Sequence, residues 1–221
     1  NTEDPAEKQP QEALSVNRGL PAFLGGLVKG TSTALVHYSS DQVFNGRKDS
    51  PYTEEDKADP VSVCGKSRLA GEQALLELNA DNICVIRTGW LFGHEGDNFL
   101  KRLLERAQTE ETVEVIHDQI GSPTYVNDLA QATLQLVKRG ASGLYHVANT
   151  GQASWCELAA EAVRQASLAC TVRAIASPDK SLRPSNEVLS SAKYAAFTGN
   201  AMRPWSQALR EYIYSVLIAS K

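Results

Sequence analysis

Short apolar runs alternate with amphipathic segments along most of this chain. The run TALVHYSSD at 33–41 and the run NICVIRTGWLFG at 82–93 have the length and the β-branched, aromatic composition of strands buried on both faces. Between them, VSVCGKSRLAGEQALLELN at 61–79 carries apolar residues at helical spacing. Strands and helices that alternate in this way build a sheet covered by helices, so the chain is predicted to have an α/β fold.

The other periodic segments continue this alternation. Asp97 is predicted to cap one helix, Asn127 or Asp128 to open the next, and Ser154 to form a capping box with Glu157. Further helices are predicted at 12–30, 97–110, 128–140, 155–166 and 203–217, and further strands at 112–118, 143–149 and 170–177.

Composition excludes several classes of function. The 221 residues are 42% hydrophobic and 22% charged, with a net charge of -4 and scattered Lys and Arg, so we expect neither a nucleic acid nor a membrane partner. No apolar run approaches the length of a membrane span and no secretory leader is evident, so a cytoplasmic location is expected. The cysteines are widely spaced and show no Cys/His ligand pattern, so we expect free thiols and no metal site; they are Cys64, Cys84, Cys156 and Cys170.

Polar and aromatic residues follow the predicted strands. They are residues 39–41 after the first strand, residues 88–90 after the second, and the loop after 112–118. In open α/β sheets, ligands bind beyond the carboxyl ends of the strands. These three clusters therefore predict a pocket for a small molecule at one rim of the sheet.

Longer motifs in a fixed order make this expectation specific. The motifs are, in order, LVHYSSDQVFNG, SPYTEEDKADPVSVCGKSRLAGE, IRTGWLFG, NFL, DQIGSPTYVNDLA, LRPSNEVLSSAKY and RPW. With these motifs, the chain resembles the dTDP-4-dehydrorhamnose reductase family, within the extended short-chain dehydrogenase/reductase superfamily, from about Asp4 to Trp205. SSDQVFNG and DQIGSPT are specific to this branch.

The resemblance implies a Rossmann-like, doubly wound parallel sheet with a smaller C-terminal α/β region that binds substrate. Residues 1–95 would be the remaining part of the dinucleotide-binding domain. Residues 96–221 would be mainly substrate-binding, with a strand near 143–148 returning to the sheet.

The resemblance also implies a reaction: reduction by NADPH or NADH of the C4 ketone of a dTDP-linked 6-deoxyhexulose, which gives dTDP-L-rhamnose. Ser40 would polarise the ketone, Asp41 would hold the sugar, Trp90 would line the sugar pocket and Tyr38 would lie along the nicotinamide. Further positions that would face the nucleotide-sugar are Asn98, Gln119, Thr124 and Arg183.

Two catalytic and cofactor-binding positions depart from the family pattern. Cys64 stands where the family has a tyrosine that donates a proton, and Arg68 stands where it has the lysine that assists it. A thiol is shorter than a phenol and donates hydrogen bonds poorly. Arg68 keeps the positive charge but has a different shape.

The second departure concerns the start of the family fold, where a strand, a glycine-rich GxxGxxG turn and a helix hold the cofactor diphosphate. No such motif occurs in this sequence. We therefore expect weak dinucleotide binding and an open sheet edge at 33–41, which a second copy or a partner chain would cover. The sequence is interpreted as a fragment of a longer protein or as one chain of a complex.

Three interpretations follow. The first is a nucleotide-sugar reductase with an altered proton donor, which the motifs around Ser40 and Gln119 favour. The second is a non-catalytic regulatory or scaffolding subunit, similar to the β subunit of methionine adenosyltransferase, which Cys64 and Arg68 favour. A related epimerase or dehydratase fits less well, because those enzymes also use the tyrosine and lysine that are absent here.

Overall fold

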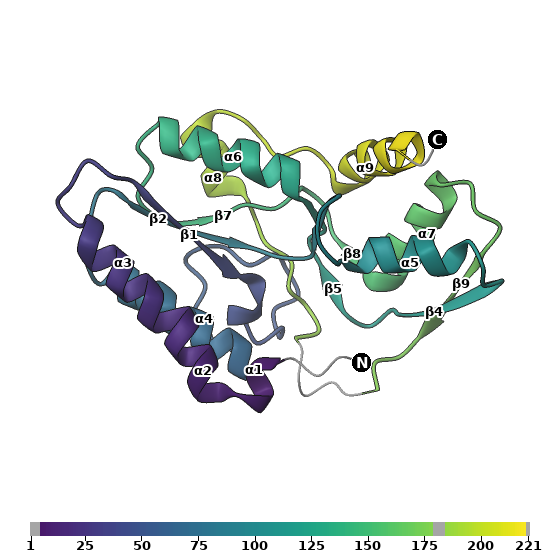
Figure 1. Cartoon of the computed structure of the whole chain (residues 1–221), viewed down its shortest axis with the longest axis horizontal. Helices are drawn as coiled ribbons and strands as arrows, with labels where there is room; N and C mark the ends of the chain where they lie inside the picture. The colour runs from purple at the N-terminus through teal and green to yellow at the C-terminus, as the bar shows by residue number, and fades with distance from the viewer. Residues whose placement is uncertain (1–4, 179–183, 220–221) are drawn as a thin grey trace.

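The computed structural model describes residues 5–178 and 184–219 and has two lobes (Figure 1). The first lobe is built on a parallel sheet in the order β1-β2-β7, formed by β1 (Leu35–Ser40), β2 (Ile83–Thr88) and β7 (Gly143–His146). All six residues of β2 are buried, because β2 is the central strand and both of its faces are covered. The α/β fold and the parallel sheet predicted from the sequence are confirmed.

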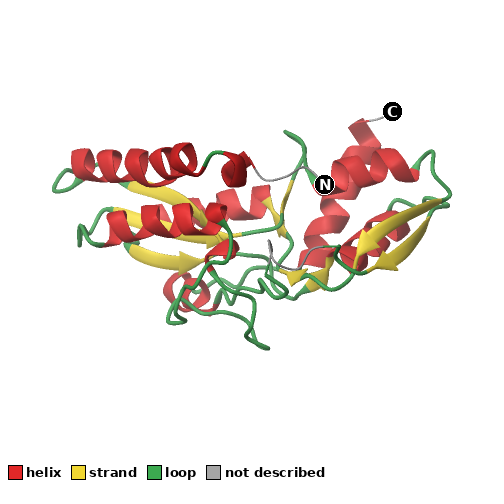
Figure 2. Ribbon diagram, turned by 90° about the horizontal axis from the view of Figure 1, so that it is seen from below, coloured by secondary structure: helices red, strands yellow, loops and turns green. Residues whose placement is uncertain are grey.

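Helices cover both faces of this sheet (Figures 1 and 2). On one face lie α4 (Val63–Leu76) and a helical run over residues 5–28 that is interrupted at Gln9, and on the other lie α6 (Val126–Lys138) and α8 (Ala192–Thr198). The helical run comprises α1 (Pro5–Lys8), α2 (Pro10–Leu14), the π-helical turn η1 (Ser15–Gly19) and α3 (Leu20–Val28).

The two faces of β2 form two separate cores, because successive side chains of a strand point to opposite sides. Ile83 and Val85 pack with Leu75 of α4. Cys84 and Ile86 belong to the core on the other face, which α6 supplies. The central strand thus ties the two helical layers together.

The second lobe has its own core. β4 (Thr112–Ile116) pairs in parallel with β9 (Thr171–Ile175), and α5 (Phe99–Ala107), α7 (Trp155–Gln165) and α9 (Trp205–Ala219) pack beside them (Figure 2). α5 and α7 bury one apolar face each, as their predicted spacing requires.

Short elements connect the lobes. β3 (Leu91–Phe92) pairs in parallel with β6 (Thr124–Tyr125), and β5 (Ile120–Gly121) pairs antiparallel with β8 (Ala153–Ser154). β3 follows β2 directly, so the chain leaves the first sheet and enters the second lobe at the carboxyl end of β2. A 3-10 turn, η2 (Asp41–Val43), follows β1 at the same rim.

The helix starts show where local prediction succeeds. Ser154 and Glu157 form the predicted capping box at the start of α7. The prediction that Asp97 caps α5 is wrong, because Asn98 is the cap and accepts the N–H of Lys101. The prediction that α6 opens at Asn127 or Asp128 is also wrong, because α6 begins at Val126 with no side-chain cap.

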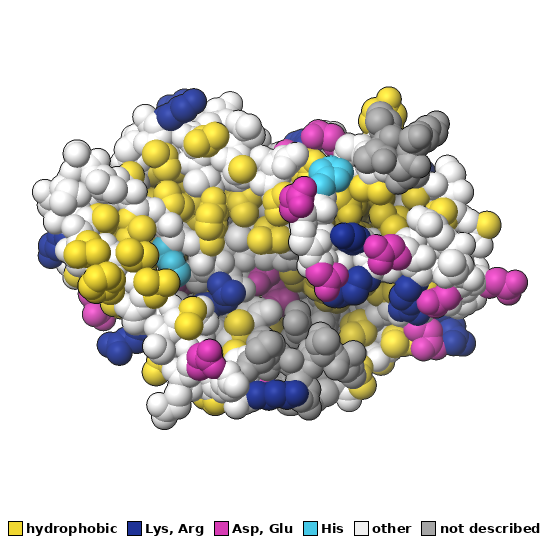
Figure 3. All heavy atoms as spheres, viewed as in Figure 1, with side chains coloured by type: hydrophobic (Ala, Val, Ile, Leu, Met, Phe, Trp, Pro, Cys, Tyr) yellow, Lys and Arg dark blue, Asp and Glu magenta, His cyan; other side chains and the backbone are white. Residues whose placement is uncertain are grey.

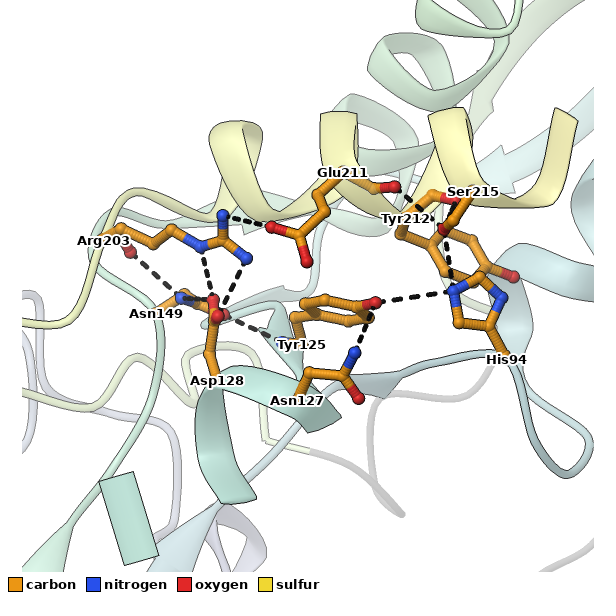
Figure 4. A network of polar contacts seen from close by, with 9 residues as sticks. All are labelled: His94, Tyr125, Asn127, Asp128, Asn149, Arg203, Glu211, Tyr212 and Ser215. Carbon is orange, nitrogen blue, oxygen red and sulfur yellow. Dashed lines mark hydrogen bonds and ion pairs between the residues drawn. The ribbon is translucent and has the colours of Figure 1, made fainter. Parts of the chain in front are cut away.

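Asn127 and Asp128 instead belong to a polar network that fastens α9 to α6 (Figure 4). Arg203 binds Asp128 through Nε and Nη2, each at 2.8 Å, and Glu211 through Nη1 at 2.7 Å. Asn149 bridges this pair to the backbone N–H of Tyr125 at 2.8 Å. A half-buried network with bidentate geometry holds α9 in one register. The residues drawn are His94, Tyr125, Asn127, Asp128, Asn149, Arg203, Glu211, Tyr212 and Ser215.

Strand β1 lies at an edge of the first sheet. Within the described residues, β1 pairs with β2 on one side and with no strand on the other. Hydrophobic side chains gather on this face over α3 and along the sheet, with Phe23 64% and Leu27 59% exposed (Figure 3). Exposed apolar surface beside an open strand edge is typical of an interaction surface. None of the described helices is long and apolar enough to cross a membrane.

Candidate active site

A cavity of about 310 Å³ lies at the carboxyl ends of β1 and β2, between the two lobes. It is the place that the strand-end rule predicts for a ligand. The described residues that line it are Tyr38, Ser39, Ser40, Asp41, Gln42, Arg68, Thr88, Gly89, Trp90, Leu91, Trp155 and Glu187.

Ser40 and Asp41 form the polar end of the cavity. The Ser40 hydroxyl donates to Asp41 Oδ1 at 2.9 Å and accepts the N–H of Gln42 at 3.2 Å. Asp41 is 3% exposed and lies against the backbone of Gly89, where an added Cβ would be 1.6 Å from Asp41 Oδ2. Glycine at position 89 therefore allows a carboxylate to lie between the ends of β1 and β2.

Trp90 forms the aromatic wall. Its ring stacks on Trp155 with centroids 3.6 Å apart and planes 5° apart, and its Nε1–H donates to Glu187 Oε2 at 3.1 Å. Its backbone φ is 50°, which is uncommon for a residue other than glycine and persists only where the surroundings hold it. Gly121 lies so close to the indole that a Cβ there would be 2.2 Å from it. The wall is therefore fixed from both sides.

Two hydroxyls in the cavity lining are buried without a hydrogen-bond partner among the described residues. They are Ser39 Oγ and Thr88 Oγ1, in residues that are 3% and 4% exposed. Buried polar groups are almost always hydrogen-bonded to protein, water or ligand. The cavity therefore has polar capacity that a bound molecule can use.

Helix α4 carries the two altered positions. Ser62 caps it by accepting the N–H of Gly65 at 3.0 Å, and Gly65 lies against the carbonyl of Gln42, where a Cβ would be 2.2 Å from the oxygen. Arg68 lines the cavity, whereas Cys64, half-buried one turn earlier, is not part of the lining.

A buried ion pair fixes α4 on the sheet one turn beyond Arg68. Glu72 accepts from Arg87 Nε at 2.9 Å and from Nη2 at 2.6 Å, and both side chains are almost completely buried. Arg87 Nη1 also lies 3.4 Å from Nε2 of His146. Losing either partner of such a pair leaves an uncompensated charge in the interior, so the position of α4 is strongly determined.

A second, more apolar groove of about 190 Å³ adjoins the cavity, and Tyr38 and Arg68 line both. Tyr38 is 42% exposed, and its hydroxyl lies 2.8 Å from Oγ1 of Thr133 on α6. His37 lies in the groove, where burial lowers its pKa; nearby Glu72 raises that pKa and Arg68 lowers it. The net lowering keeps the imidazole neutral near pH 7.

The structure brings some predicted site residues together and not others. Tyr38, Ser40, Asp41, Arg68 and Trp90 share the cavity. Three others lie outside its lining and have local partners: Asn98 caps α5 and donates to the Gly93 carbonyl, Gln119 lies 3.4 Å from the Ser177 hydroxyl, and buried Thr124 donates to the Ser122 carbonyl. Arg183 lies outside the described residues.

Sequence reasoning assigned no site role to four residues of the cavity lining, Gln42, Leu91, Trp155 and Glu187. Trp155 was predicted only as the first residue of a helix, and Glu187 only as part of the motif LRPSNEVLSSAKY. The motif was the available signal for Glu187, because a carboxylate within a specific motif is a candidate ligand-binding residue. Among the residues that the structure describes, no three His, Cys, Asp or Glu side chains are placed to hold a metal ion.

Comparison with known proteins decides the family. The family model described as "RmlD substrate binding domain" matches residues 1–218. The chain belongs to this family. As an RmlD-type chain, it is 38% identical over 216 residues to the spore coat polysaccharide biosynthesis protein SpsK of Bacillus subtilis, covering 95% of this chain and 74% of that protein.

Two further relatives carry names that state a reaction. The dTDP-4-dehydrorhamnose reductase of Sinorhizobium fredii is 32% identical over 232 residues, covering 99% of this RmlD-type chain and 78% of the reductase. The crystal structure of dTDP-4-dehydrorhamnose reductase from Bacillus anthracis in complex with NADP matches with a TM-score of 0.91 and 30% identity, covering 97% of this chain and 77% of that one. The Rossmann-like fold and the family resemblance drawn from the motifs are confirmed.

Proposed function

We propose that this chain takes part in the NAD(P)H-dependent reduction of the C4 ketone of a dTDP-linked 6-deoxyhexulose to dTDP-L-rhamnose. The supporting observation is that Ser40, Asp41 and Trp90 lie in one cavity at the carboxyl end of the sheet. The relatives named as dTDP-4-dehydrorhamnose reductases support the same reaction. We also propose a cytoplasmic location, which the widely spaced cysteines favour.

In this proposal Ser40 polarises the ketone. Its hydroxyl donates to Asp41 in the structure, and rotation about χ1 redirects the same proton to a carbonyl oxygen in the cavity. Asp41 then accepts a hydrogen bond from a hydroxyl of the sugar, and the indole of Trp90 packs against the sugar ring. Hydrogen-bond donors placed where negative charge develops stabilise the alkoxide as it forms.

NADPH or NADH supplies the hydride, and residues of this chain fit its nicotinamide-ribose end. Tyr38 and Arg68 lie where the cavity meets the apolar groove, and a guanidinium donates readily to ribose hydroxyls. The chain contains no GxxGxxG turn for the cofactor diphosphate. We propose that residues 1–95 contribute the cofactor side and residues 96–221 mainly the sugar side, while β7 completes the first sheet.

A non-catalytic regulatory or scaffolding role is the alternative, and Cys64 and Arg68 favour it. The Cys64 side chain is not part of the cavity lining and does not replace a phenol that reaches the substrate oxygen. Loss of a positioned general acid typically costs about 10²–10⁴ in rate.

Restoring the tyrosine and lysine of the family at positions 64 and 68 tests whether the chain is a reductase or a scaffolding subunit. The variant Cys64→Tyr with Arg68→Lys is assayed for reduction of a dTDP-4-keto-6-deoxy sugar, with this chain joined to a cofactor-binding segment of the family. An increase in kcat of about 10² or more over the parent is expected if the cavity is a reductase site. A well-folded variant that binds both ligands and shows no gain would support the scaffolding role.

A further inference from the structure

Thr88 ends β2 and places a buried hydroxyl in the wall of the cavity. The residue is 4% exposed, and its Oγ1 has no hydrogen-bond partner among the described residues. A buried hydroxyl without a partner lowers stability, because its hydrogen bonds with water are lost and not replaced. The Thr88 hydroxyl therefore does not help to hold the protein together, and a molecule bound in the cavity is the partner that its position allows.

Thr88 and Ser40 form a pair across the sheet. They are register partners at the ends of the parallel strands β1 and β2. Successive side chains of a strand alternate between the two faces, and Val36 of β1 and Ile86 of β2 pack into the same core. Ser40 and Thr88 lie four and two residues further along these strands, so both project from this face. Ser39 projects from the other face, so its hydroxyl is not part of the pair.

The spacing of this pair suits two donors to one oxygen atom. Neighbouring strands of a sheet lie about 4.8 Å apart. Two hydroxyls that each donate to the same oxygen at about 2.8 Å lie up to about 5.6 Å apart, so a shared acceptor fits between the two strand ends. An oxygen atom bound by Ser40 is therefore within reach of Thr88.

We propose that Thr88 is a second hydrogen-bond donor, beside Ser40, to the C4 oxygen of the dTDP-linked sugar. The inference rests on the proposed function and extends it, because it assigns to this oxygen a donor that the family resemblance does not name. Two donors directed at one oxygen stabilise the negative charge that develops there during reduction. Thr88 keeps its proton throughout, so its role is to bind the oxygen and stabilise that charge.

The test removes the contact from each side in turn. Calorimetry measures Kd for dTDP-L-rhamnose, for its 4-deoxy analogue and for dTDP, with the wild-type chain and with Thr88→Val, which replaces the hydroxyl by a methyl group. Thr88→Val should weaken dTDP-L-rhamnose binding by about five- to tenfold and leave the other two ligands within about twofold, because only the C4 oxygen loses a bond. Thermal unfolding should give a Tm at or above that of wild type, since the hydroxyl has no protein partner to lose.

Thr198→Val is the matched control. Thr198 is also buried, at 1% exposed, but it lies on α8 outside the cavity lining, and its hydroxyl donates to the Tyr194 carbonyl at 2.9 Å. This variant should lower Tm, because a hydrogen bond within the protein is lost, and should leave all three Kd values unchanged. A second control, Thr88→Ser, keeps the hydroxyl and should retain the wild-type preference for dTDP-L-rhamnose over the 4-deoxy analogue.

A structural role for Thr88 gives a different result. If Thr88→Val acts by displacing Trp90, dTDP-L-rhamnose and its 4-deoxy analogue are weakened equally, and this outcome overturns the proposal, as does unchanged binding of dTDP-L-rhamnose. If Thr88→Val does not fold, Thr88→Ala is measured in the same way, with the same selective loss expected. A wild-type chain that binds no dTDP-linked sugar refutes the proposed function and this inference with it. Normal wild-type binding with no selective loss in the variant refutes this inference alone.

Discussion

Replacing Gly89 by alanine tests the construction of the cavity. The added methyl would lie 1.6 Å from Asp41 Oδ2 and 2.2 Å from its Cγ, far inside van der Waals contact, and the φ of Gly89 is not in the left-handed region. The backbone therefore tolerates alanine, and the strain falls on the buried Asp41 carboxylate. The carboxylate has to move, and the 2.9 Å bond from Ser40 is lost with it.

The cost follows from these two effects. Overpacking a buried site costs about 1–3 kcal/mol, and a hydrogen bond to a charged group contributes about 1.5–3 kcal/mol. A total of about 2.5–6 kcal/mol should lower Tm by roughly 5–24 °C in a chain of this size. Thermal unfolding followed by circular dichroism measures the shift, and calorimetry with dTDP-L-rhamnose should show weaker binding.

Two controls isolate the cause. Gly26→Ala, on an exposed helical surface with no atom within 4 Å of the new Cβ, should raise stability by about 0.5–1 kcal/mol. In an Asp41→Ala background the cost of Gly89→Ala should fall below about 1 kcal/mol, because the carboxylate that clashes with the new methyl group is absent. A Gly89→Ala protein that melts within about 2 °C of wild type would refute the reasoning.

Two further predictions concern stability and assembly. Burial, followed by the charge of Arg87, lowers the pKa of His146 from 6.5 to about 3. Below pH 6.5 the imidazole is protonated in the unfolded state but stays neutral in the folded state, so protonation favours unfolding. His146 should therefore reduce the unfolding free energy by about 2 kcal/mol between pH 7 and pH 5. His146→Gln should remove this part of the pH dependence, as measured by urea titrations. We also propose that a second copy or a partner chain covers the open edge of β1, so Phe23→Glu should reduce any dimer seen by light scattering; a dimer that persists unchanged would contradict this.

The sequence predicts the periodic elements well. The runs around β1 and β2 are apolar enough to identify buried strands, and the capping box at Ser154 is a local signal that tertiary contacts do not override. Helix starts are harder, because Asn98 and Asp97 are equally good caps by residue type. Tertiary geometry selects Asn98, whose amide also reaches the Gly93 carbonyl, while Asp97 pairs with Arg102.

The site was predictable only in part. Ser40 ends β1, and Asp41 and Trp90 lie just beyond β1 and β2, so the strand-end rule finds them. Trp155 and Glu187 enter the cavity from the second lobe and from a segment between the lobes, and no local pattern indicates that they meet Trp90. The need for glycine at positions 89 and 121 becomes clear only when the atoms beside them are known.

The cavity takes its walls from both lobes, since Ser40 and Asp41 lie at the carboxyl end of β1 in the first lobe and Trp155 begins a helix of the second. A molecule seated there touches both halves of the protein and acts as a removable cross-link. At a concentration of 100 times Kd, such a ligand adds about 2.7 kcal/mol to the free energy of unfolding. Ligand occupancy should therefore couple the unfolding of the two lobes more tightly.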